Sequence, residues 1–292
     1  MSATAASLSS PSSNQTGKPD IGIIGGTGFY EFLTDPETVE VDTPFGTPSA
    51  PVSIGDVNGR QVAFLPRHGV HHQFPPHLVN YRANLWALRA LGVRQVLGPC
   101  AVGSLKPELG PGTFVVPDQV VDRTWGRRHT VYDIEGPVVH IGFADPYCPR
   151  GRQAFLTSAS RETGAGTGAL ADGGTLVVIN GPRYSTRAES QWHAAAGWSV
   201  VGMTGMPESS LARELALCYS TVCLVTDHDA GVEGGEAVSH AEVVRQFDAN
   251  IDRLKTLLLD VIGALPEPEN DEAAVCSCRR ALDGIELPIQ LP

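Results

Sequence analysis

The strongest constraint on the fold is an apolar run that passes directly into a glycine-rich turn, at residues 21–30 (IGIIGGTGFY). A continuous apolar run of this kind predicts a fully buried strand. The glycines let the turn approach a ligand closely, and successive backbone N–H groups in such a turn can cradle an anion. The hydroxyl of Thr27 would add a further donor. A purely structural turn fits the same residues, so both interpretations stay open.

The turn matches neither of the two familiar nucleotide-binding loops. A dinucleotide fingerprint requires a third glycine, and Glu31 occupies that place after Gly26 and Gly28. A phosphate-binding P-loop requires glycine, lysine and then serine or threonine, and no lysine follows here. The functional interpretation that remains is a site for a small anion.

The composition limits the class of protein and its partners. At 292 residues, with 42% apolar residues, 18% charged residues and 32 glycines, the chain suits a mixed fold with a substantial core. The net charge of −11 and the lack of a long basic run argue against nucleic acid as a partner. Because the overall field repels anions, an anionic substrate would need a local cluster of donors.

The two ends of the chain differ from the middle. Residues 1–19 are rich in Ser, Thr and Ala and hold no apolar core long enough for a signal peptide, which predicts a disordered leader. We expect one folded domain over residues 20–265, followed by a linker and C-terminal tail over 266–292. No apolar run reaches membrane-spanning length. We therefore expect no membrane partner and a soluble, cytoplasmic protein.

Strand-like and helix-like segments alternate along the domain. Apolar runs predict strands at residues 61–66, 95–98, 113–117, 175–179, 199–203 and 221–226. Helical spacing predicts one helix from Pro75-Pro76 to Leu91, another over 207–217, and a third that a Ser239/Glu242 capping box begins. Residues 122–149 have the composition of a long functional loop. This alternation predicts a single α/β domain with a central mixed, largely parallel sheet flanked by helices.

Polar residues follow several of these strands at their carboxyl ends, where α/β sheets bind ligands. Arg67 and His68 end one strand and could donate to a phosphate, although Arg67 could equally form a surface salt bridge. Asp227 and Asp229 stand two residues apart, so both would project to one side of a continuing strand. Two close carboxylates raise at least one pKa and permit a neutral proton donor. A polar turn is the alternative for this pair.

Other chemistries find less support. His68, His71 and His72 are closely spaced, but with no acidic or cysteine partner nearby in the sequence they predict a polar loop rather than a metal site. No Gly-x-Ser-x-Gly elbow is present for a serine nucleophile. The six cysteines are scattered and predict reduced core thiols. Cys276 and Cys278 could form a redox or metal pair, but without a second pair we expect an exposed tail.

Taken together, seven segments resemble the methylthioadenosine phosphorylases, in the trimeric branch of the purine nucleoside phosphorylase superfamily. The resemblance covers about residues 21–265 and identifies this region as a nucleoside phosphorylase domain. The segments are residues 21–28 (IGIIGGTG), 42–49 (DTPFGTPS), 67–69 (RHG), 79–88 (VNYRANLWAL), 181–190 (GPRYSTRAES), 203–208 (MTGMPE) and 226–229 (TDHD).

The resemblance implies a transferase that uses inorganic phosphate to displace adenine from C1′ of a 5′-modified adenosine, with no metal or organic cofactor. It assigns phosphate to Thr27, Arg67, His68, Ala101, Thr204 and the backbone amide of Cys100. It places Met203 against the ribose, Tyr184 and Ser185 beside the base, and Val243 in the methylthio pocket. The segment holding Asp227, His228 and Asp229 would face the purine.

Within that segment the resemblance gives the two acids separate roles. Asp227 matches the proton donor to N7, and Asp229 matches the group that engages the 6-amino substituent. Physical chemistry agrees, because an oxocarbenium-like transition state needs a protonated leaving base and a nearby anion. A neutral carboxyl supplies the first and bound phosphate the second. His140 matches a residue that reaches a neighbour's pocket, which implies a homotrimer with active sites completed at subunit interfaces.

Three positions depart from the family pattern. Cys100 replaces a threonine and so loses a hydroxyl. Gly202 replaces an asparagine, as in relatives that act on 6-oxopurines, yet Asp229 would repel a 6-oxygen, so we favour 6-aminopurines. His240 replaces an apolar residue and either admits a smaller or more polar 5′ group, such as hydroxyl or halogen, or turns outward. The alternatives are a 6-oxopurine or methylthioinosine phosphorylase, a 5′-halo-5′-deoxyadenosine phosphorylase, and a non-catalytic nucleoside-binding homologue.

Overall fold

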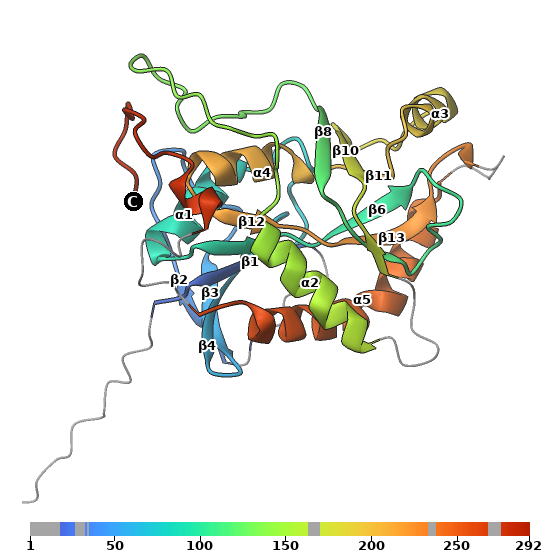
Figure 1. The fold of residues 1–292 in the computed structure, drawn as a ribbon, viewed down its shortest axis with the longest axis horizontal. Coiled ribbons are helices and arrows are strands. Elements are labelled where there is room, and N and C mark those ends of the chain that lie inside the picture. Colours follow the sequence, from blue (N-terminus) through green and yellow to red (C-terminus); the bar gives the residue numbers. More distant parts are fainter. Residues whose placement is uncertain (1–17, 27–32, 34, 163–169, 233–237, 268–275) are drawn as a thin grey trace, which may run out of the picture.

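The strands of the protein form two sheets that share the middle of the molecule (Figure 1). The computed structural model describes residues 18–26, 33, 35–162, 170–232, 238–267 and 276–292. Residues 1–17 of the predicted leader and Thr27 in the glycine-rich turn therefore lie outside the described residues. One sheet has six strands in the order β12-β5-β1-β4-β3-β2, and the other has seven in the order β8-β10-β11-β6-β13-β7-β9.

The first predicted strand lies inside the six-stranded sheet. It is β1 (Ile21–Gly25), which pairs in parallel with β4 (Arg60–Pro66) on one side and β5 (Gln95–Leu97) on the other. Ile23 packs into one core cluster and Ile24 into another on the opposite face. This burial on both faces explains the unbroken apolar run. The sheet is completed by β2 (Glu37–Val39), β3 (Val52–Val57) and β12 (Cys218–Ser220).

The seven-stranded sheet carries most of the polar strand ends. Its core strand β13 (Cys223–His228) pairs in parallel with β6 (Cys100–Ser104), which pairs antiparallel with β11 (Val200–Gly202). The remaining strands are β7 (Phe114–Val116), β8 (Gln119–Arg123), β9 (Leu170–Asp172) and β10 (Thr175–Ile179).

Two neighbouring chain segments pass from one sheet into the other. The first segment runs from β5 to β6 and the second from β12 to β13, each across a two-residue break. Hydrogen bonds continue across the breaks, from the amide of Gly98 to Ser220 O at 2.9 Å and from the amide of Cys100 to Val222 O at 3.1 Å. Pro99 has no amide hydrogen to continue the ladder. The predicted single α/β domain with a mixed, helix-flanked sheet architecture is confirmed. The two-residue breaks divide the strands into two sheets, however, where the sequence predicted one.

Five α-helices among the described residues cover the sheets. On one side, α2 (Pro149–Glu162) lies against α5 (His240–Ala264), and on the other α1 (Tyr81–Leu91) lies against α4 (Gly205–Glu214) (Figure 1). The fifth helix, α3 (Arg187–Ala195), follows β10. The predicted loop is confirmed between β8 and α2, and Figure 1 shows this green segment running along the top of the view.

The helix boundaries correct two predictions. Helix α1 begins at Tyr81 rather than at Pro75-Pro76, because the side chain of Asn80 caps it by accepting from the amide of Ala83 at 3.3 Å. Leu78, which lies within the predicted helix, precedes the observed one and is 62% exposed. At α5, Ser239 is the N-cap but its side chain accepts no capping hydrogen bond, and the Glu242 side chain accepts from Arg245 and Gln246, so the predicted capping box does not form.

The described part of the C-terminal tail packs onto its own domain. Ile289 and Leu291 contact the core cluster that α1 and α4 form with the six-stranded sheet, and Figure 1 shows this red segment beside those helices. Cys276 and Cys278, at a short 3₁₀ helix (Ser277–Arg280), are 5% and 2% exposed. The expectation that these cysteines lie in an exposed tail is therefore wrong. Within the described ranges, no helix combines the length and apolar character needed to cross a membrane.

Candidate active site

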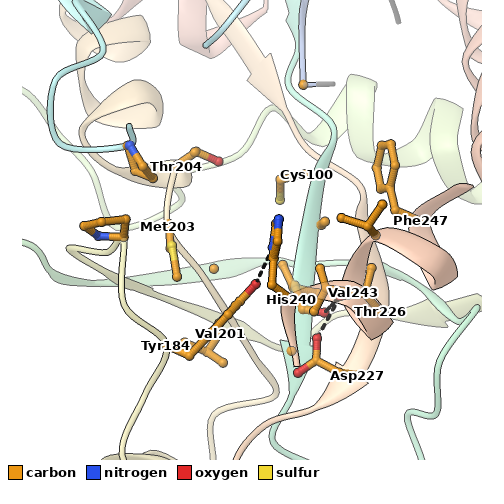
Figure 2. Close-up of a pocket in the computed structure, with 18 of the residues that line it drawn as sticks. Cys100, Tyr184, Val201, Met203, Thr204, Thr226, Asp227, His240, Val243 and Phe247 are labelled. Atoms are coloured by element: carbon orange, nitrogen blue, oxygen red, sulfur yellow. Dashed lines mark hydrogen bonds between the residues drawn. The ribbon is translucent and has the colours of Figure 1, made fainter. Parts of the chain in front are cut away.

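A cavity of about 550 Å³ opens where strands of the two sheets end, within the size range of small-molecule sites. Its walls come from the end of β4, from β6, from β11 with the residues that follow it, from the end of β13 and from the first turns of α5. Figure 2 shows Thr204 and Asp227 on opposite sides of this space, with Tyr184 and His240 between them. Polar groups of different chemistry therefore lie at its two ends.

The acidic end holds the predicted carboxylate pair. Asp227 and Asp229 both line the cavity, as expected for positions two apart, whereas His228 between them does not. Burial raises the pKa of Asp227 to about 6, the Thr226 hydroxyl that donates to Asp227 Oδ1 at 2.8 Å opposes this rise, and the Asp229 carboxylate adds to it. A carboxyl with this pKa keeps its proton in about one molecule in ten at pH 7, whereas one with the ordinary pKa of 3.8 would keep it in fewer than about one in a thousand.

Asp229 is held more rigidly than Asp227. Its side chain accepts a hydrogen bond from the hydroxyl of Ser190, the residue is 3% exposed, and its amide donates to Ser104 O at 2.9 Å. Asp229 therefore presents an oriented acceptor to the cavity. The helix that carries Ser190, α3, was not predicted from the sequence and is fixed by a Thr186/Glu189 capping box.

Two glycines make room at this end. A Cβ atom at Gly103 would lie 3.1 Å from Asp227 Oδ2 and 3.3 Å from Asp229 Cβ, so a larger residue would crowd both acids. A Cβ atom at Gly202 would lie 3.3 Å from Val102 Cγ1 and 3.4 Å from Leu176 Cδ1. The family's asparagine would be tightly packed there, and its absence leaves Gly202 as bare backbone on the cavity wall.

Ser185 adds an unused polar group beside the acids. Its hydroxyl is buried and has no hydrogen-bond partner among the described residues, and Ser185 lines the cavity. A buried hydroxyl without a partner costs free energy unless a ligand or water satisfies it. This position agrees with the role beside the polar edge of a base that the sequence suggested.

The middle of the cavity is lined by aromatic and apolar groups with one polar pair. The Tyr184 hydroxyl and His240 Nδ1 lie 3.1 Å apart, and Val243 and Phe247 continue the same wall from α5 (Figure 2). Of the two orientations left open for His240, the structure has the inward one. Met203 lines the cavity opposite this wall.

Arg67 at the other end is bound largely by the protein itself. It is 2% exposed and makes a two-bond ion pair with Glu208, at 2.7 Å from Nε and 2.9 Å from Nη2. It also donates to Pro99 O and Ile24 O. The surface salt bridge considered from the sequence is thus a buried one. One of the five guanidinium hydrogens, on Nη1, remains for a ligand.

His68 is oriented by the loop that follows it in the chain. Its Nδ1 donates to Phe74 O at 2.8 Å, since a carbonyl oxygen can only accept, and its ring stacks on His72 with centroids 4.5 Å apart. Burial, and after it the charge of Arg67, lowers the pKa of His68 from 6.5 to about 4. The ring is therefore neutral at pH 7, with Nε2 as an available acceptor.

The neighbouring strand and helix add further polar groups. The amide of Cys100 donates to Val222 O, so the expectation that it is free for phosphate is wrong. The next amide, on Ala101, points to the other edge of β6, away from β13 and toward β11. Among the described strands β11 pairs only with Gly103 and Ser104 of β6, so this pairing does not extend to Ala101. Thr204 is the N-cap of α4 without a side-chain capping bond, so its hydroxyl is not used by the helix.

Two predicted residues, His228 and His140, lie outside the cavity lining, and two important residues were not predicted. His140 is exposed in the long loop and does not line the cavity. Glu208 was not recognised as the partner of Arg67. Arg127 was also missed: it is 8% exposed and donates to Met203 O at 2.9 Å and Asn180 O at 2.8 Å, which fixes two segments of the cavity wall. Its sequence context does not distinguish it from the exposed Arg128.

The comparisons with known proteins agree on one family. A model of the Phosphorylase superfamily matches residues 20–263. A relative from Streptomyces coelicolor named purine nucleoside phosphorylase is 58% identical over 94% of this chain and 98% of its own length. A relative from Mycobacterium tuberculosis named S-methyl-5′-thioadenosine phosphorylase is 55% identical, covering 93% and 97%. The crystal structure of a methylthioadenosine phosphorylase from an antarctic soil metagenomic library matches with a TM-score of 0.83 at 37% identity, covering 91% of this chain and 92% of that one.

Proposed function

Because the chain belongs to the methylthioadenosine phosphorylase family of the Phosphorylase superfamily, we propose that it cleaves 5′-methylthioadenosine, or a related 5′-modified adenosine, with inorganic phosphate. The products are adenine and the 5-modified ribose 1-phosphate. One observation carries the proposal. A single cavity has a carboxyl of raised pKa, Asp227, at one end and the polar groups of His68 and Thr204 at the other.

In the reaction, a phosphate oxygen forms a bond to C1′ while the bond from C1′ to N9 of the base breaks. The electron pair of that bond moves into the purine, and the Asp227 carboxyl gives its proton to N7. Adenine leaves neutral, and Asp227 is left as a carboxylate that regains a proton from solvent. Protonation of the leaving group by a positioned acid contributes about 10²–10⁴-fold in rate.

At the phosphate end, the neutral state of His68 sets the direction of one hydrogen bond. Phosphate at pH 7 is a mixture of H₂PO₄⁻ and HPO₄²⁻, and both species carry an O–H that can be donated to the free Nε2 of His68. The amide of Ala101, the hydroxyl of Thr204 and the remaining hydrogen of Arg67 then donate to the other oxygens. These few oriented donors hold the anion in a protein whose overall charge opposes it.

Asp229 selects the base in this proposal. Its oriented carboxyl oxygen accepts from a 6-amino group and repels a 6-oxygen. A second candidate, phosphorolysis of 6-oxopurine nucleosides such as methylthioinosine, is favoured by Gly202 and by the name of the Streptomyces coelicolor relative. Asp229→Asn should raise the ratio of kcat/KM for methylthioinosine over methylthioadenosine at least tenfold. Ser190→Ala keeps the carboxylate and is the control, and an unchanged ratio in Asp229→Asn would remove base selection from this residue.

The 5′ substituent is recognised at His240, which is hydrogen-bonded to the base-side residue Tyr184, and at the adjoining Val243. The imidazole offers hydrogen bonding to a hydroxyl, whereas Val243 and Phe247 offer apolar contact to a methylthio or halogen group. Adenosine and 5′-halo-5′-deoxyadenosines are therefore substrates to compare with methylthioadenosine.

The assembly and setting of the enzyme belong to the same proposal. We place the active protein in the cytoplasm, in purine salvage, as a homotrimer in which the exposed His140 completes the cavity of a neighbouring subunit. The reaction uses phosphate as a co-substrate and no metal or organic cofactor. Sedimentation of the purified protein measures the trimer, and His140→Ala should raise KM for the nucleoside if the neighbour contributes this residue.

The decisive experiment follows base release from four substrates: methylthioadenosine, adenosine, a 5′-chlorinated adenosine and methylthioinosine. Adenine should be released only when phosphate is present, and arsenate should replace phosphate. Release of hypoxanthine faster than adenine would favour the second candidate. Binding of the nucleosides without any phosphate-dependent cleavage would instead identify a non-catalytic homologue and refute the proposal.

A further inference from the structure

Four cysteines that are far apart in the sequence meet in the structure. Cys148, Cys218, Cys276 and Cys278 are all buried, and their sulfur atoms all lie within 4.8 Å of one another. We propose that these four thiolates bind one Zn²⁺ ion as a structural site. The sequence suggested no such site, because only two of the four cysteines are close neighbours along the chain.

The spacing of the sulfurs fits a tetrahedral ion. Zinc–sulfur bonds of about 2.3 Å place the corners of a tetrahedron about 3.8 Å apart. Cys148 Sγ and Cys276 Sγ are 3.7 Å apart, and none of the six cysteines is joined to another by a disulfide. A disulfide would require a sulfur–sulfur distance of about 2.05 Å. Four convergent sulfur ligands are the donor set of structural zinc sites.

Three separate segments hold the thiols in place. Cys218 begins β12, and Cys148 lies beside that strand because its amide donates to Tyr219 O at 2.7 Å. Cys276 and Cys278 come from the tail, where the amide of Arg279 donates to Cys276 O at 2.9 Å and forms a tight turn. Backbone hydrogen bonds therefore position the segments that carry the four thiols, independently of a bound metal.

The surroundings carry the charge that such a site requires. Four thiolates and one Zn²⁺ ion have a net charge of −2, and four protons leave the thiols on binding. Arg213 Nη2 lies 3.9 Å from Cys278 Sγ as a hydrogen-bond donor. Arginines also line a small hollow that Cys218 and Cys276 share. These arginines are Arg60, Arg94, Arg150 and Arg279, and the acids of the same hollow, Asp20 and Glu267, both pair with Arg60, which leaves an excess of positive charge.

The site would act on stability and not on the chemical step. None of the four cysteines lines the nucleoside cavity. By joining the tail to β12 and to the start of α2, the ion would fix the chain end against the domain. Metal that binds the folded state but not the unfolded one stabilises it by mass action.

The first test measures metal in the full-length protein purified under reducing conditions from zinc-supplemented cells. We expect about one zinc per chain by elemental mass spectrometry. The double variant Cys276→Ser/Cys278→Ser should lose it. Cys223→Ser, which removes a buried thiol outside the cluster, should retain it and is the matched control. Zinc at background level in the unaltered protein would overturn the proposal.

A second test does not depend on a variant that folds. Cobalt added to the metal-free protein should give the visible absorption of a tetrahedral tetrathiolate complex, and zinc should displace it. Thiols are then counted after denaturation in chelator without reductant. Six thiols are expected, whereas two would show that the cluster forms two disulfides, which would overturn the zinc assignment. Metal binding is measured without nucleoside or phosphate, so the result tests the zinc proposal independently of the proposed catalytic function.

Discussion

Replacing Asp227 with asparagine should abolish most activity and at the same time stabilise the protein. Burial raises the pKa of this carboxyl from 3.8 to about 6, and one pKa unit corresponds to about 1.36 kcal/mol. The ionised form is therefore disfavoured in the folded state by about 3 kcal/mol. Asparagine keeps the shape of the side chain and can still accept from Thr226, but it carries no charge.

The sign of the pH dependence follows from which state binds the proton. Below pH 3.8 the acid is protonated in both states and has no effect on stability. As the pH rises through 3.8 to 6, the unfolded chain ionises first, so the folded state holds more protons and loses stability. The penalty is about 1.5 kcal/mol at pH 5 and reaches about 3 kcal/mol at pH 8. Asp227→Asn removes it, so the gain should double between these pH values.

Urea unfolding and thermal melts at pH 5 and pH 8 measure this gain. For a chain of this size, 3 kcal/mol corresponds to a rise in Tm of roughly 6 °C. Asp248→Asn, at an exposed acid of the same cavity, is the control and should change stability by less than about 0.5 kcal/mol. Turnover of methylthioadenosine should fall about 10²–10⁴-fold in Asp227→Asn. A gain in stability that is equal at both pH values, or no gain at pH 8, would refute the conclusion that burial disfavours the ionised form of Asp227.

Three other changes probe the same cavity. Thr226→Val removes the hydroxyl that lowers the pKa of Asp227, so the alkaline limb of kcat/KM, expected near pH 6, should move upward by about one unit; an unmoved limb would exclude Asp227 as its origin. His240→Leu should raise kcat/KM for methylthioadenosine over adenosine about tenfold, and a fall in that ratio would contradict a polar 5′ contact. Glu208→Gln leaves the Arg67 charge buried without its partner and should cost about 3–5 kcal/mol of stability in urea unfolding, with a higher KM for phosphate. The control, Glu242→Gln, lies in an exposed ion pair and should leave both the stability and the KM for phosphate unchanged. A similar response of Glu208→Gln and Glu242→Gln would show that the buried Arg67–Glu208 pair matters no more than an exposed one.

The fold class could be predicted because local patterns carry it. The run at Ile21–Gly25 is apolar on both faces because helices cover both faces of its sheet, and alternating strands and helices then require mostly parallel pairing. The division into two sheets could not be predicted. It depends on hydrogen bonds of Gly98 and Cys100 to residues more than a hundred positions away, across breaks that look like ordinary turns in the sequence.

The acidic end of the site was also accessible from the sequence. Positions 227 and 229 share one side of a strand by simple alternation, and the structure indeed turns His228 away from the cavity. The partners of these groups were not accessible. Nothing local connects Asp229 with Ser190, or Arg67 with Glu208, and it is those contacts that decide which donors and acceptors remain for a ligand.

By itself, then, the sequence determined the buried strands, the polar residues at their ends and the family to which these motifs point. The tertiary structure decided which polar groups are already used, how far burial moves each pKa, and that four distant thiols share one pocket of the core. The physical reason is range. Periodicity acts between neighbours along the chain, whereas desolvation, ion pairing and ligand geometry depend on distances in space that only the packed fold sets.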